Sequence, residues 1–212
     1  MVFSPRFRLS NQALRLLCFL SVIVGSLQSC TSNSSLKSIY APLPAGVDTS
    51  GPFFQHNVSL IKYWDRMSSA NRATNFAWWD SSGTVREMND FYDKVVVLSF
   101  FGTWSVPALA QLPIIDAIRS SGDTNVMFIG VTMREGVTGR KAVIRIDSIM
   151  QARSTRYQVL IGSRDFGFTY GGVDAVPTTF VISRKRRVEA TFEGFVTEEK
   201  LLEAIVKAET KP

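Results

Sequence analysis

Few residues in this chain of 212 residues could carry nucleophilic, redox or metal chemistry. The chain contains two cysteines, Cys18 and Cys30, and one histidine, His56. A transition-metal site usually draws on a cluster of cysteine and histidine side chains, and the sequence contains no such cluster. The sequence therefore predicts neither a metal nor another cofactor, and it places no thiol beyond residue 30.

One serine stands where a helix is expected to begin. The run Val95–Phe101 is β-branched and aromatic, which is typical of a strand buried on both faces of a sheet. Trp104-Ser105-Val106-Pro107-Ala108 follows it, and apolar residues then recur at helical spacing. A nucleophilic Ser105 would need a general base within hydrogen-bond reach, and nothing in the sequence places His56 there. We therefore expect Ser105 to cap the helix, with Pro107 tolerated in the first turn.

The N-terminus predicts an exported, membrane-anchored protein. Three arginines precede the apolar segment Leu16 to Val24, which is too short to span a bilayer as a helix of about 20 residues. Leu27-Gln28-Ser29-Cys30 then resembles a bacterial lipobox, in which cleavage leaves a lipidated cysteine at the new N-terminus. An ordinary secretory cleavage site and an uncleaved anchor are the alternatives. In each case the chain leaves the cytoplasm, and we expect it in the cell envelope.

The sequence divides into three parts. Residues 1–29 are predicted to be a signal peptide, 30–58 a lipid anchor and tether rich in Ser, Pro and Gly, and 59–212 one folded domain. The signal peptide carries three Arg and no acid, so its removal lowers the formal net charge from +6 to +3. This weak positive charge favours solubility over nucleic-acid binding.

Hydrophobic periodicity predicts an α/β order of elements. A short amphipathic helix is expected over about 59–69, with a β-hairpin after it and a solvated basic turn, Arg184 to Arg187, between two late strands. A contact of that turn with anionic lipid is the alternative. The other expected elements are strands at 76–79, 84–86, 126–131, 159–161, 178–183 and 188–192, and helices at 109–118, 140–153 and after Thr197.

This order, together with several local motifs, resembles the thioredoxin-like redoxins of the TlpA/ResA type. The resemblance runs from Thr74-Asn75-Phe76 through Ile205 and includes Gly102-Thr103-Trp104, Leu112-Pro113 and Val176-Pro177-Thr178-Thr179-Phe180. It implies a thioredoxin-like α/β fold with a mixed central sheet flanked by helices and an N-terminal β-hairpin extension. It also implies a cis peptide bond between Val176 and Pro177.

The same resemblance implies that the redox positions are substituted. Ser105 stands at the nucleophilic cysteine, Ala108 at the resolving cysteine, and Gln111 at an acid that many members carry. Thiol–disulfide exchange needs a thiolate to attack and a second thiol to release the mixed disulfide. The resemblance also implies a groove beside the cis-proline, where an extended peptide pairs with backbone next to Trp104.

We therefore expect a redox-inactive envelope lipoprotein that serves as a binding or scaffold module for an extended polypeptide or a membrane partner. The alternative is a thiol–disulfide oxidoreductase or peroxidase of the redoxin family. A purely structural role for Trp104 and Pro177 is also open. The residues expected to contact a partner are Trp104, Val106, Pro107, Val176 and Pro177.

Overall fold

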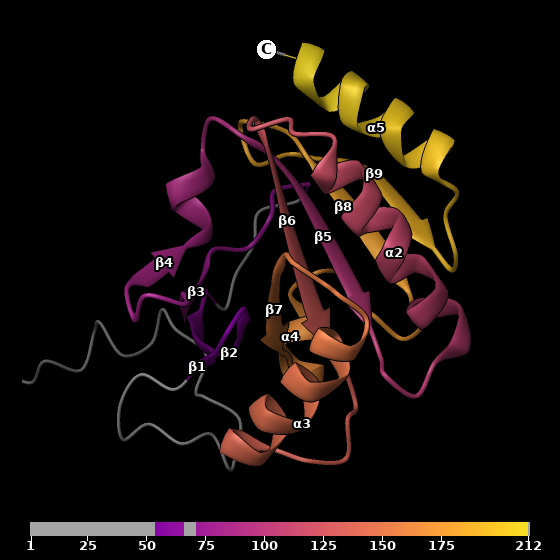
Figure 1. Ribbon diagram of the computed structural model, residues 1–212. Coiled ribbons are helices and arrows are strands. Elements are labelled where there is room, and N and C mark those ends of the chain that lie inside the picture. Colours follow the sequence, from indigo (N-terminus) through magenta and orange to yellow (C-terminus); the bar gives the residue numbers. More distant parts are fainter. Residues whose placement is uncertain (1–53, 66–70, 212) are drawn as a thin grey trace, which may run out of the picture. The chain divides into compact units, whose positions relative to one another are not determined.

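A computed structural model of the chain describes residues 54–65 and 71–211 (Figure 1). The predicted signal peptide, the predicted lipidation site Cys30 and most of the predicted tether lie outside these ranges. The first described strand, β1, begins at Phe54, ahead of the predicted domain boundary at residue 59. Regular structure therefore starts within the predicted tether.

The described strands form one mixed sheet, as predicted. Its strand order is β4-β3-β2-β7-β6-β5-β8-β9, and β1 pairs with β2. The pairs β2–β7, β7–β6 and β6–β5 are parallel, whereas β3 and β8 run antiparallel to their neighbours. The bounds are β1 Phe54–Gln55, β2 Val58–Trp64, β3 Phe76–Trp79, β4 Val85–Glu87, β5 Val95–Phe101, β6 Val126–Thr132, β7 Gln158–Ile161, β8 Thr178–Ile182 and β9 Val188–Glu193.

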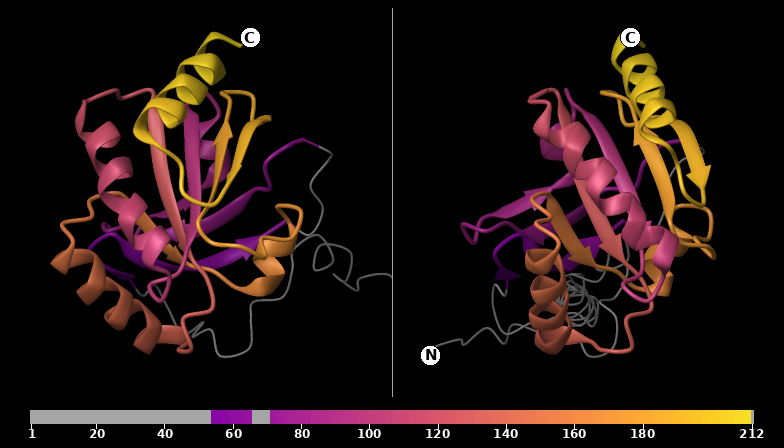
Figure 2. Two further views of the ribbon diagram at one scale, coloured as in Figure 1. Left: turned by 90° about the vertical axis from the view of Figure 1, so that its right-hand side faces the viewer. Right: turned by 45° about the vertical axis from the view of Figure 1, so that its right-hand side comes forward.

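Helices cover both faces of this sheet. Side chains alternate between the two faces along each strand, so each strand contributes to the core on both sides. Val95, Val97 and Phe101 of β5 pack in one core cluster with α2 (Val106–Ser120), α3 (Gly139–Ala152) and α5 (Glu198–Thr210). The intervening β5 residues pack in a second cluster with the short helix α4 (Arg164–Phe168) and the 3-10 helix η3 (Met88–Phe91). Figure 2 shows α2 and α5 on the same side of the sheet.

The prediction of a helix over 59–69 is wrong, because residues 58–64 form strand β2, which lies between β3 and β7 in the sheet. Leu60 and Trp64 stand four positions apart, as on one face of a helix, but β2 has a register shift between Ile61 and Tyr63. That irregularity turns the side chains of Leu60 and Trp64 into different core clusters, one on each face of the sheet. Residues 66–69 of the predicted helix lie outside the described ranges.

The predicted N-terminal hairpin is confirmed by the antiparallel pairing of β3 with β4. Trp78 is buried and Trp79 is partly exposed, as their opposite orientations require. The Lys62 ammonium of β2 lies 5.2 Å from the Trp79 ring centroid and partly covers that ring.

The basic turn is only partly solvated. Lys185 and Arg187 are exposed, but Arg186 folds back and donates hydrogen bonds to the Asn89 side chain and, at 2.6 Å, to the Ala73 carbonyl. Its burial lowers the pKa of Arg186 below the ordinary value for arginine. Arg186 therefore fastens this turn to the N-terminal part of the domain.

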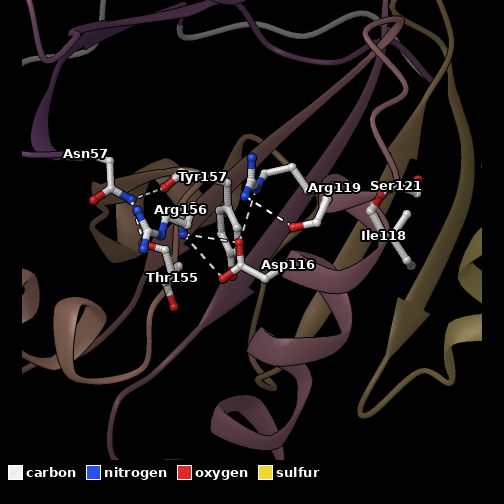
Figure 3. Close-up of polar contacts among 9 residues, drawn as sticks. Asn57, Asp116, Ile118, Arg119, Ser121, Thr155, Arg156 and Tyr157 are labelled. Carbon is white, nitrogen blue, oxygen red and sulfur yellow. Dashed lines mark hydrogen bonds and ion pairs between the residues drawn. The ribbon is translucent and has the colours of Figure 1, made fainter.

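Polar contacts tie the carboxyl-terminal half of α2 and the β1–β2 turn to residues 155–157, between α3 and β7 (Figure 3). Asp116 of α2 accepts hydrogen bonds from the Arg119 side chain at 3.2 Å and from the backbone N–H of Arg156 at 3.1 Å. The side-chain amide of Asn57 donates to the carbonyl groups of Thr155 and Tyr157. These contacts join α2 and the β1–β2 turn to the segment that leads into β7.

Candidate functional site

The loop after β5 presents Trp104 at the surface with one edge of its ring fixed. The side chain is 54% exposed, and its indole N–H donates to the Met133 carbonyl at 3.0 Å. The ring lies so close to Gly102 that a Cβ there would be 2.6 Å from Trp104 Cε2. Only glycine fits this approach without a shift. Trp104 is therefore a fixed and partly exposed aromatic platform.

The buried carboxylate of Glu135 holds the loop after β5 through Thr103. Glu135 lies just after β6, and its two oxygens accept hydrogen bonds from the Thr103 backbone N–H at 2.9 Å and from the Thr103 hydroxyl at 2.5 Å. Glu135 and Met133 thus hold neighbouring residues of the same loop. Sequence reasoning missed Glu135, because its partner is more than thirty positions away.

Ser105 begins α2, as predicted, but its side chain does not cap the helix. The hydroxyl instead donates to the Val176 carbonyl at 3.3 Å, and the Val176–Pro177 bond is cis, as the resemblance implied. His56 is engaged elsewhere, with Nδ1 3.1 Å from an Asp147 carboxylate oxygen on α3. Among the described residues no base is hydrogen-bonded to the Ser105 hydroxyl, so nucleophilic catalysis by this serine has no support.

Ala108 and Gln111 are buried under the first turns of α2. The Gln111 amide N–H donates to the Thr179 hydroxyl at 2.8 Å, and its carbonyl accepts from the Val196 backbone N–H at 3.1 Å. The Thr179 hydroxyl also lies 3.1 Å from that of Ser99. This network contains no charged group, and both ends of the Gln111 amide have a hydrogen-bond partner.

An exposed apolar surface surrounds the start of α2. Val106 is 78% exposed, and Phe195, in the loop between β9 and α5, is 49% exposed. Phe195 is held near the site because Gly194 N–H donates to the Pro177 carbonyl at 2.7 Å. Sequence reasoning missed Phe195, which no local motif marks. We call this set the Trp104 surface: Trp104, Val106, Pro107, Val176 and Phe195.

One predicted contact residue needs correction. Pro177 is buried, so its ring is not available to a partner and it acts by shaping the backbone. Val176 is half-buried beside it, and Pro107 is exposed. The structure therefore brings together all the predicted contact residues, but only four of the five offer side-chain surface.

Replacing Gln111 with glutamate is expected to make stability depend on pH. The new carboxyl would be buried, which raises its pKa above the value of about 4.3 in the unfolded chain. Because the folded state then holds the proton more tightly, Gln111→Glu should be most stable below about pH 4 and lose stability as pH rises, by about 1.4 kcal/mol per unit of pKa increase. Urea unfolding at pH 4 and pH 7 measures this loss. Gln111→Leu is the control, and an equal pH dependence in both variants would contradict the prediction.

Two further features of the described residues bear on function. They contain no group of three or more His, Cys, Asp or Glu side chains that could hold a metal ion. No helix within these ranges is both long enough and apolar enough to cross a membrane.

Comparisons with known proteins place this site in context. No protein-family model matches the chain. The chain is 26% identical over 144 residues, 68% of its length, to a thiol-disulfide oxidoreductase ResA from Bacillus thuringiensis subsp. konkukian, and the match covers 80% of that protein. A ResA from Bacillus subtilis is 24% identical over 135 residues, 63% of this chain and 72% of the relative.

Solved structures confirm the predicted thioredoxin-like fold. A thioredoxin-family thiol:disulfide interchange protein from Chlorobium tepidum superposes with a TM-score of 0.56 at 17% identity, covering 68% of this chain and 99% of that one. The pneumococcal exposed lipoprotein thioredoxin from Streptococcus pneumoniae gives a TM-score of 0.53 at 21% identity, with 63% and 98% covered.

Proposed function

We propose that this chain, a thioredoxin-like protein similar in sequence to ResA thiol-disulfide oxidoreductases, binds an extended polypeptide without exchanging disulfides through its own side chains. The Trp104 surface is the binding surface, and the partner is a protein segment that adds alongside the backbone at Val176. A scaffold role follows from the same surface if the bound segment belongs to a larger assembly.

The observation that carries this proposal is the chemistry of the substituted site. The chain has no cysteine after Cys30, so neither Ser105 nor Ala108 can form a mixed disulfide. The Ser105 hydroxyl donates to a backbone carbonyl, and Ala108 is buried. Gln111 sits in an uncharged hydrogen-bond network. Ser105, Ala108 and Gln111 therefore supply neither a thiol nor a readily titrated group at these three positions.

The exposed apolar side chains beside the Val176 backbone support the proposal of peptide binding. Trp104 and Val106 expose apolar surface beside the Val176 backbone, and their positions are fixed by hydrogen bonds and by the helix. A rigid aromatic platform next to backbone suits an extended peptide, because apolar burial adds affinity and the backbone fixes direction.

The names of the relatives favour a second candidate function, thiol–disulfide oxidoreduction. For this chain the reaction would need thiols from Cys18, Cys30 or another protein, since residues 54–212 contain no cysteine. A peroxidase would need a reactive thiol in the same way. Thiol chemistry at the site is therefore the outcome that would replace our proposal.

We further propose that the protein is anchored in the cell envelope through a lipid on Cys30. The lipobox-like sequence supports this location, and one of the similar solved structures is described as an exposed lipoprotein thioredoxin. Metabolic labelling with a palmitate analogue tests it: the label should be incorporated by the wild type and lost in Cys30→Ala.

Binding of an unfolded polypeptide tests the main proposal. The probe is a reduced, S-carboxymethylated protein, which stays extended and has no free thiol, so that any complex is non-covalent. We expect saturable binding, together with amide shifts on the Trp104 surface by nuclear magnetic resonance. Absence of binding, or shifts confined to another face, would contradict the proposal.

A further inference from the structure

A second site lies at the carboxyl ends of the parallel strands β6 and β7. A pocket of about 230 Å³ opens there between β2, the β6–α3 loop and the β7–α4 loop. The helix after β6 packs in one core cluster and the helix after β7 in the other, so the two connections leave on opposite faces of the sheet. In open α/β sheets, the crevice where neighbouring connections diverge is a preferred place for ligands. We call it the β6–β7 pocket.

The walls of the pocket are mainly apolar. An engineered apolar cavity of about 150 Å³ can hold benzene, so this pocket has room for a two-ring aromatic body or a short alkyl chain. Its apolar walls come from three elements: Leu60, Ile61, Trp64, Val137 and Ile161.

Positive charge surrounds the mouth. Arg134 and Arg164 line the pocket and are exposed. Helix α3 begins at Gly139, on the pocket wall, and its first turn contains Arg140 and Lys141 but no acid. Arginine and lysine are unfavourable at the positive end of a helix, so this pattern raises the potential at the mouth.

Three acids lie near the mouth, and one of them, Asp165, directly follows Arg164 in the first turn of α4. Glu135 lines the pocket, but both of its carboxylate oxygens accept hydrogen bonds from Thr103 in the neighbouring loop. An Asp174 carboxylate oxygen lies 3.6 Å from Arg134 Nη2, and Arg134 Nη1 donates to the Asp174 carbonyl at 3.4 Å. Both side chains are largely exposed, so these contacts are weak. An incoming anion can therefore compete for Arg134.

The backbone of Arg134 is unusual for such a side chain. Its φ is +58°, in the left-handed region that glycine adopts most easily. Residues other than glycine held in this region are concentrated at functional sites, where the side chain is needed despite the strained backbone. At this position the conformation sets a guanidinium at the mouth of an apolar pocket.

We propose that the β6–β7 pocket binds a small amphipathic anion, with an apolar body between β2 and the β6–α3 loop and a carboxylate or phosphate at Arg134 and Arg164. Apolar burial supplies affinity, and the two guanidinium groups select the negative head group. This site is separate from the Trp104 surface, although Glu135 touches both regions.

The probe for this proposal is 2-naphthoate, with the uncharged 2-naphthalenemethanol as its matched control. Titrated into the full chain, 2-naphthoate should shift the amide resonances of Val137, Thr138 and Gly162 and bind at least threefold more tightly than the alcohol. Binding of the alcohol with equal affinity, or no shift of these amides at millimolar probe, would overturn the proposal.

Arg134→Gly separates binding from folding. Glycine accepts a φ of +58°, so the variant should be at least as stable as the wild type, yet bind 2-naphthoate about fivefold more weakly and the alcohol unchanged. If Arg134 had only a structural role, Arg134→Gly would bind 2-naphthoate and the alcohol with the same affinity ratio as the wild type, which would contradict the proposal.

Three other variants locate the probe. Val137→Trp fills the pocket and should weaken both probes, whereas Arg119→Gln, in the contact cluster of Figure 3, should change neither. Trp104→Ala should also leave both affinities unchanged. Loss of naphthoate binding in Trp104→Ala would place the probe on the Trp104 surface and refute the pocket, whether or not the polypeptide proposal holds.

Discussion

Replacing Trp104 with alanine is expected to weaken binding of the S-carboxymethylated polypeptide at least tenfold. The ring is 54% exposed in the free protein, so a bound segment can still cover much of it. Covering an indole contributes on the order of 1–3 kcal/mol, and about 1.4 kcal/mol corresponds to a factor of ten in affinity. Because the ring packs little in the core, the melting temperature should fall by no more than about 3 °C. Calorimetric titration and thermal unfolding of the same variant give both quantities.

Tyr92→Ala is the matched control for this experiment. Tyr92 is another exposed aromatic residue, 47% exposed, and lies directly after η3 outside the Trp104 surface. Its replacement should leave the affinity for the polypeptide unchanged. If Trp104→Ala is clearly destabilised while its affinity stays at the wild-type value, the indole serves the fold and the binding surface lies elsewhere.

Introducing cysteine at both substituted positions is expected to create thiol–disulfide exchange activity at this site. Ser105 directly precedes α2 at the N-cap position, and Ala108 lies about one turn later on the buried side. A thiol at a helix N-terminus has a lowered pKa, so the Ser105→Cys, Ala108→Cys variant should form a disulfide and accelerate insulin reduction by dithiothreitol. The gain should be limited, because the neutral Gln111 supplies no proton acceptor near position 108.

The single variant Ser105→Cys is the control, since one thiol can attack a disulfide but has no partner to release the mixed disulfide. Its thiolate should attack oxidised glutathione, form a mixed disulfide and release one reduced glutathione, with no turnover. A double variant that folds but stays fully reduced in air would show that the loop no longer holds the two positions in disulfide geometry.

The sheet could be predicted from the sequence where strands are buried on both faces. Val95–Phe101 is apolar at nearly every position, which only a central strand requires. β2 could not be predicted in this way, because Leu60 and Trp64 stand four positions apart, which matches a helix. The register shift between Ile61 and Tyr63, which sends these two side chains to different core clusters, belongs to the pairing of β2 with the distant strand β3.

The candidate site was predictable as far as it is local. Trp104, Ser105 and Ala108 occupy one loop and one helical turn, so their order along the chain defines their positions. Glu135 and Phe195 are brought to the same region by the folding of distant segments, through hydrogen bonds to Thr103 and at Pro177. The capping role predicted for Ser105 failed for the same reason, since the competing acceptor on Val176 is 71 positions away.

The rate of insulin reduction by dithiothreitol, measured with the wild-type chain, tests the central claim most directly. A site with Ser105 and Ala108 in place of thiols cannot form a mixed disulfide, so the rate should equal that of buffer alone at every protein concentration. The Ser105→Cys, Ala108→Cys variant serves as the positive control in the same assay. Acceleration that rises in proportion to wild-type protein, after contaminating thioredoxin is removed, would contradict the account and establish thiol chemistry.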